Sequence, residues 1–132
     1  MSRFVVPLVS LVICLRVLAA DGAPGVGKLS YNQHIQPILA ENCFACHGPD
    51  SSARKAKLRL DRAEFATAKR GDGDIEPAIV PGDLAASPLI ERIKSTDEEE
   101  RMPPPESHKH LSPAEIALLQ RWVQESAHYE EH

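Results

Sequence analysis

Residues 43–47 read Cys-Phe-Ala-Cys-His, and this C-x-x-C-H spacing constrains the chain more than any other feature. Two thiols three positions apart, with an imidazole directly after them, can carry a c-type haem. The same residue types can also hold zinc or exchange disulfides. Each of these sites needs a different surrounding structure, so the remainder of the 132-residue chain must decide between the three interpretations.

Residues 1–20 have the pattern of a secretory signal peptide. A short start containing Arg3 precedes an apolar run at 4–15, and small residues follow at Ala19 and Ala20. The run is too short to cross a bilayer, which needs about 20 apolar residues. We therefore predict export to the periplasm or cell surface, cleavage after Ala19 or Ala20, and no integral membrane span once the signal is removed.

The exported domain is acidic and poor in cysteine. Loss of residues 1–20 leaves 13 of the 15 basic residues against 19 acidic ones, a net charge of −6. This balance argues against nucleic acid as a partner, because nucleic-acid recognition relies on basic surface. Cys14 lies in the predicted signal peptide and would be removed with it, which leaves two cysteines. A secreted domain held together by disulfides usually has more, so this class of protein is not favoured. Aromatic residues make up only 5% of the chain, so the core is thin and a bound group could fill it.

The hydrophobic pattern predicts an all-α domain that starts near the cysteine motif. One helix is expected from about residue 36 into the motif, with Pro37 in its first turn, where proline is tolerated. A second, short helix is expected at 61–71, with Asp61 as its N-cap. The following stretch up to residue 88 is rich in glycine and proline and is predicted to be a loop.

Two further helices are expected in the second half. One starts at Pro88 with Ser87 as its cap. The last helix has the strongest signals: Ser112 is the N-cap, Pro113 takes the first helical position, and Glu115 completes a capping box. Its apolar residues recur at helical spacing and predict one buried face.

The surroundings of the motif favour haem over zinc and thiol exchange. A closed zinc site usually has four ligands in two short-spaced pairs, and His108 and His110 are too close to form the second pair. A thiol-exchange motif expects a strand before it, whereas an apparent helix leads in here. We therefore predict one haem c, attached through thioether bonds to Cys43 and Cys46, with His47 as the proximal iron ligand.

Met102 is the predicted distal ligand. Electron-transfer haems normally fill the second axial position, and methionine sulfur there raises the reduction potential. Met102 is the only methionine besides the initiator, and three prolines after it stiffen the backbone. A gap-filling core methionine is the alternative role, and His108 or His110 could replace it as ligand. Arginines that could reach the haem propionates, none of them singled out, are Arg59, Arg92 and Arg101.

The segments YNQHIQPILAENCFACHGPD, KLRLD, AIVPGDLAASPLIERI, RMPPP and LSPAEIALLQRWV together resemble the cytochrome c domain at the front of large planctomycete multidomain proteins. The resemblance covers 30–128, after a flexible lead-in at 21–29 and before 129–132, the start of a linker or truncated tail. It implies a small class I cytochrome c-like fold around one covalently attached haem, with the last helix crossing the first. The chain has Ser126-Ala127 where the family has Gly-Ala, and we expect it to be without the large downstream domains of the family.

These observations predict an exported monohaem cytochrome that carries single electrons to redox partner proteins or domains. Because Met102 and His47 would both bind the iron, no open position remains for a substrate, and we do not expect an enzyme. Two alternatives remain. The chain could be a haem sensor or peroxidase-like protein in which Met102 binds weakly, or it could be a zinc-stabilised interaction module.

Overall fold

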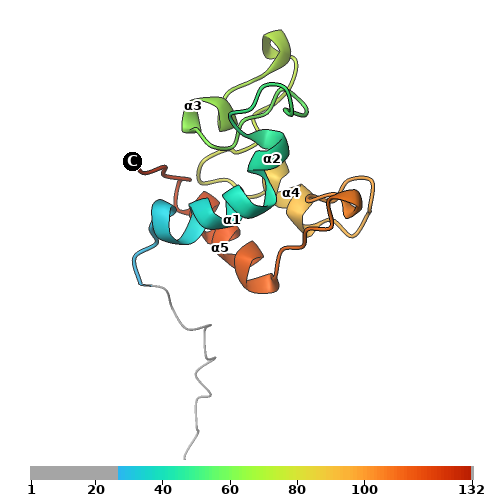
Figure 1. Ribbon diagram of the computed structural model, residues 1–132. Coiled ribbons are helices and arrows are strands. Elements are labelled where there is room, and N and C mark those ends of the chain that lie inside the picture. The colour runs from blue at the N-terminus through green and yellow to red at the C-terminus, as the bar shows by residue number, and fades with distance from the viewer. Residues whose placement is uncertain (1–26, 132) are drawn as a thin grey trace, which may run out of the picture.

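The computed structural model describes residues 27–131, and within them the chain is helical with no β-strand (Figure 1). The predicted all-α class is therefore confirmed. The predicted signal peptide, residues 1–20, lies outside the described residues. In chain order the elements are η1 (Tyr31–Ile35), α1 (Gln36–Asn42), α2 (Phe44–His47), α3 (Ala63–Ala66), η2 (Gly71–Gly73), α4 (Pro88–Lys94), η3 (Pro105–Ser107) and α5 (Pro113–Gln124). None of the helices in the described part is long and apolar enough to span a membrane.

The first helical segment begins about five residues earlier than predicted. Ser30 is its N-cap, and the Ser30 side chain accepts a hydrogen bond from the backbone N–H of Gln33. The first turn is a π-helix in which the N–H of Gln36 donates to the carbonyl of Tyr31. Pro37 explains the wider turn, because its ring would clash with the carbonyl four residues earlier and it has no N–H to donate. From Gln36 the chain continues as the α-helix that leads into the motif.

The predicted helix at 61–71 is reduced to the single turn α3, and the predicted cap is wrong. Arg62 is the N-cap and makes no side-chain cap hydrogen bond. The carboxylate of Asp61 instead accepts two hydrogen bonds from Arg59, at 3.0 and 2.6 Å. A local ion pair thus takes the oxygens that would have capped the helix.

Helix α4 begins where predicted, but Ser87 does not cap it through its side chain. The Ser87 hydroxyl, buried in the core, accepts from the N–H of Val80 at 2.9 Å and donates to the carbonyl of Asp83 at 2.6 Å. The Ser87 hydroxyl therefore stabilises the loop that precedes α4 by bonding to two of its backbone groups. This loop has no regular strands, only isolated bridges that pair Arg70 with Ile75 and Val80 with Asp83.

Helix α5 agrees with the sequence in detail. Ser112 is the N-cap, Pro113 lies in the first turn, and Ser112 and Glu115 form the reciprocal capping box. Its buried face carries Leu119, Trp122 and Val123. The capping signals are local, which is why they can be read without tertiary information.

The core lies where α5 packs against η1 and α4 (Figure 1). The largest fully buried apolar side chains are Ile35, Leu39, Leu60, Ile79, Leu119 and Val123. Beside them, Tyr31, Trp122 and Tyr129 form an aromatic cluster, with ring centroids 4.6–5.6 Å apart. The packed chain therefore continues past residue 128, where the sequence placed the start of a linker or tail.

The chain leaves α5 through two residues with positive φ. Ser126 has a φ of 75° and Ala127 a φ of 47°, and the N–H of Ala127 donates to the carbonyl of Trp122 at 2.8 Å. This is the left-handed helix stop that glycine favours. Ser126 adopts it without glycine's freedom, and the turn directs Tyr129 back onto η1.

Candidate functional site

The two cysteines of the motif lie on one helical turn. Cys43 closes α1 and opens α2: its N–H donates to the carbonyl of Leu39, and its own carbonyl accepts from the N–H groups of Cys46 and His47. The Cys43 side chain is buried, that of Cys46 is exposed, and neither forms a disulfide. This turn thus brings two free thiols and an imidazole close together, as the spacing predicts.

The Cys43 thiol does not have the properties of a redox-exchange cysteine. Burial raises its pKa to about 12, and the positive charge of Lys109 lowers it only in part. Reactive cysteines in exchange motifs have lowered pKa values, because the thiolate is the attacking species. The environment of Cys43 therefore disfavours the thiol-exchange interpretation.

His47 is held by its Nδ1 atom, which lies 3.3 Å from the carbonyl oxygen of Lys55. The backbone brings that carbonyl into place, because the N–H of Lys55 donates to the carbonyl of Cys46 at 2.8 Å. An Nδ1–H that donates to a carbonyl leaves the lone pair on Nε2, which is the arrangement of a metal-binding histidine.

Burial lowers the pKa of His47, the hydrogen bond to Lys55 opposes this, and the positive charges of Arg70 and Arg92 lower it further. The imidazole is therefore kept in its neutral form, the form that can bind a metal. The same shift shows that two arginine side chains lie within electrostatic reach of the ring.

Gly48, which follows the motif directly, is required by space rather than by backbone angle. A Cβ atom at this position would lie 2.3 Å from the carbonyl oxygen of Phe44. The residues after it fold back, and Arg54 donates to the carbonyls of Gly48 and Pro49 at 3.1 and 2.9 Å. The end of the motif is therefore tightly packed.

Met102 lies on a loop attached to the same end of α1. Its N–H donates to the carbonyl of Arg92 at 3.0 Å, and Lys109, further along the loop, forms an ion pair with Glu41 of α1 at 2.9 Å. The cation of Lys109 is close enough to act on Cys43. The structure thus brings the Met102 loop to the motif, while ligation by Met102 stays a prediction.

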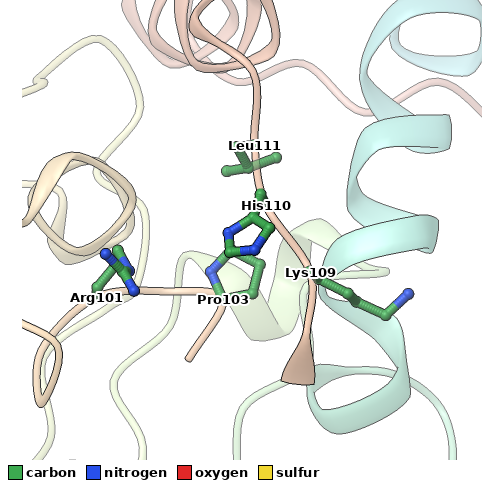
Figure 2. A pocket seen from close by; sticks show the side chains of 5 residues that line it. All are labelled: Arg101, Pro103, Lys109, His110 and Leu111. Carbon is green, nitrogen blue, oxygen red and sulfur yellow. The ribbon is translucent and has the colours of Figure 1, made fainter. Parts of the chain in front are cut away.

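The two histidines that could replace Met102 are both exposed. His110 lines a pocket of 190 Å³ together with Arg101, Pro103, Lys109 and Leu111 (Figure 2). Figure 2 shows its ring beside Pro103, the residue after Met102. His108 stands at a left-handed backbone position, with a φ of 56°. Of the two, His110 is the one that shares a pocket with Arg101 and Pro103, the chain neighbours of Met102.

Arg70 has two buried guanidinium nitrogens, and no pattern in the sequence singles it out. Its Nε and Nη1 atoms are buried and have no hydrogen-bond partner among the described residues. Leaving a buried donor unpaired costs about 1–3 kcal/mol, and more for a charged group. Of the arginines considered from the sequence, Arg59 pairs with Asp61 and Arg92 donates to the carbonyl of Glu100, while Arg101 lines the pocket beside His110.

This donor set fits haem c better than the other groups considered. Two free thiols, a neutral imidazole anchored through Nδ1 and an unpaired cation match a group with two vinyls, an iron and acidic propionates. A closed zinc site takes four ligands. No set of three or more His, Cys, Asp or Glu side chains in residues 27–131 is arranged to hold a metal ion.

Comparison with protein families agrees with this assignment. Residues 43–106 match the planctomycete cytochrome C family. The resemblance predicted from the sequence is thereby confirmed over a segment that runs from Cys43 past Met102. Neither curated proteins nor solved structures gave a match. Similarity to a cytochrome c family suggests haem binding and electron transfer, while the attachment and the axial ligands stay predictions from the residues described above.

Proposed function

We propose that the chain is an exported monohaem c-type cytochrome that carries single electrons between redox partner proteins or domains. When bound, haem c supplies one-electron redox chemistry at its iron. The observation that carries the proposal is the motif turn, where two unpaired thiols precede an imidazole whose Nδ1 is already engaged by Lys55. The family match over this turn supports it.

Each motif residue has a separate role in this proposal. The Cys43 and Cys46 thiols would hold the haem, each through one thioether bond to a vinyl group. His47 supplies the proximal ligand through Nε2, because Lys55 engages Nδ1. Gly48 leaves the room that the turn needs.

Met102 is proposed as the distal ligand that makes the protein a carrier rather than an enzyme. The hydrogen bond from its N–H to Arg92 and the pairing of Lys109 with Glu41 attach its loop at two points. Such attachment keeps a thioether in place at little further entropic cost. A sixth position filled from the chain leaves no site for a substrate.

Covalent attachment is tested by producing the chain together with a haem-attachment system and staining a denaturing gel for haem. We expect the stain to remain with the unfolded chain, because thioether bonds survive denaturation. The matched control is the chain with Cys43→Ala and Cys46→Ala, which should carry no stain. A parent chain that loses its haem in the gel, or that contains zinc in place of iron, would contradict the proposal.

The carrier role is tested at Met102. The ferric parent should show the weak near-infrared band of sulfur bound to iron, and the ferrous parent should bind carbon monoxide poorly. Met102→Ala should bind carbon monoxide readily, and Met102→His should have a lower reduction potential, because imidazole favours ferric iron more than a thioether does. Fast carbon monoxide binding by the parent would favour the sensor or peroxidase-like alternative. An unchanged spectrum in Met102→Ala would point to His110, and His110→Ala would then test that ligand.

A further inference from the structure

Arg70 carries a cation that the described protein leaves without a counter-charge. Two of its three guanidinium nitrogens, Nε and Nη1, are buried and donate to no hydrogen-bond partner within residues 27–131. Other arginines nearby are paired, as Arg59 is with Asp61 and Arg62 is with Glu64. A buried guanidinium with unmade hydrogen bonds is unfavourable unless an acidic group completes it.

The backbone around Arg70 holds the start of this side chain in place. Its N–H donates to the carbonyl of Ile75 at 2.8 Å, and its carbonyl accepts from the N–H of Ile75 at 3.0 Å. The chain between them turns through Gly71 and Gly73, both with positive φ, where glycine is the residue without strain. The position of Arg70 is therefore set by a closed turn.

Arg70 lies on the motif side of the domain. The segment that leads to it is joined to the motif, because the N–H of Leu60 donates to the carbonyl of His47 at 2.8 Å, and the charge of Arg70 contributes to the lowered pKa of His47. Of the carboxylates that follow Arg70 in the chain, Asp72 and Asp74 form no ion pair with it within residues 27–131, and Glu76 is engaged by Lys69 at 2.9 Å in an exposed ion pair. The free cation is thus close to the residue that would hold the iron.

We infer that Arg70 binds a propionate carboxylate of the haem held by Cys43, Cys46 and His47, and so sets the orientation of the macrocycle. This inference rests on the proposed function. A carboxylate fits because guanidinium donors form short, charge-assisted hydrogen bonds with both of its oxygens. Arg70 then acts as a positioning residue through the propionate and does not touch the iron.

The test begins with the parent chain carrying haem. An NMR spectrum of protein labelled with ¹⁵N should show a slowly exchanging Arg70 Nε–H with a nuclear Overhauser contact to a haem propionate methylene. The variants are Arg70→Lys, which keeps the charge and loses the planar fork, and Arg70→Gln, which loses both. Arg62→Gln is the matched control, because Arg62 is exposed and eight residues away.

Arg70→Gln should shift the propionate bending bands of the resonance Raman spectrum and lower the reduction potential, because loss of a nearby positive charge favours the ferric state. Arg70→Lys should shift the same bands with a smaller change in potential, and Arg62→Gln should match the parent in both. If Arg70→Gln does not fold, the inference is still tested by the nuclear Overhauser contact in the parent and by the Raman bands of Arg70→Lys. The inference would be overturned if the parent protein carries covalent haem but shows no contact between Arg70 and a propionate, and if Arg70→Lys leaves the Raman bands unchanged. Water would then be the hydrogen-bond partner of the guanidinium. Protein without covalent haem would overturn the proposed function.

Discussion

Replacing Gly48 by alanine should damage the motif through steric overlap alone. The added Cβ would lie 2.3 Å from the carbonyl oxygen of Phe44 and 3.0 Å from both its carbonyl carbon and its Cβ. The backbone angles do not contribute, because Gly48 has a φ of −132°, which any residue can adopt. The blocking atoms are mainly backbone, so a change of side-chain rotamer cannot relieve the clash.

The expected magnitude follows from the cost of inserting an atom into a packed site, about 1–3 kcal/mol. For a domain of this size, each kcal/mol lowers the melting temperature by ~4–8 °C. We therefore expect the haem-loaded Gly48→Ala protein to melt at least ~4 °C below the parent in a thermal scan followed by circular dichroism. Haem content per chain should also fall, because moving the Phe44 carbonyl moves the turn that carries Cys46 and His47.

Gly27→Ala is the matched control. A Cβ at Gly27 would have no atom within 4 Å, so this variant should stay within about 0.5 kcal/mol of the parent. If Gly48→Ala has the melting temperature and haem content of Gly27→Ala, the overlap is relieved without cost and the reasoning from packing fails.

Three further perturbations have expected outcomes. Cys43→Ala with Cys46→Ala should leave a poorly folded chain, because the haem would supply buried apolar surface; a cooperative thermal transition like that of the haem-loaded parent would contradict this. Hydrogen bonds from the N–H of Asn32 and the hydroxyl of Ser30, with a further one from the N–H of Tyr31, lower the pKa of Glu130 below 4.5. Its stabilisation is therefore present above pH 4.5 and lost as the pH falls through the folded value. Glu130→Gln should lower the melting temperature at pH 7 and approach the parent in acid, and a gap independent of pH would count against the role of the charge. Ser126→Gly should stabilise the chain by ~1 kcal/mol in a denaturant titration, because it removes a side chain from the left-handed region; lower stability would show that the serine makes a compensating interaction.

Local signals in the sequence were sufficient for the elements that depend on neighbouring residues. The capping box of Ser112 and Glu115 is predicted correctly, because a cap is formed by residues three positions apart. The start of α4 is predicted correctly from Pro88, because proline favours the first helical position. The C-x-x-C-H motif could be recognised for the same reason, because one helical turn brings its thiols and imidazole together. The family resemblance was likewise carried by short motifs and is confirmed over residues 43–106.

Contacts between distant segments decided the rest. Glu130 accepts hydrogen bonds from Ser30 and from the N–H groups of Tyr31 and Asn32, so residues about 100 positions apart cooperate to start the first helix early. Ser87 gave its hydroxyl to the loop at 80–83 in place of the helix. In both cases a polar side chain could form hydrogen bonds with more than one group, and the tertiary structure determines which of these bonds forms.

The same limit applies at the site. Sequence alone determined which residues can attach and ligate a haem, because thiols, imidazole and thioether are defined by residue type and spacing. It could not single out Arg70, since an arginine before a Gly-Asp-Gly turn resembles any surface arginine until burial removes its water. Tertiary structure decided that two nitrogens of this guanidinium are buried and have no hydrogen-bond partner within residues 27–131. The physical reason is that desolvation depends on what covers a side chain, and the covering residues come from other parts of the chain.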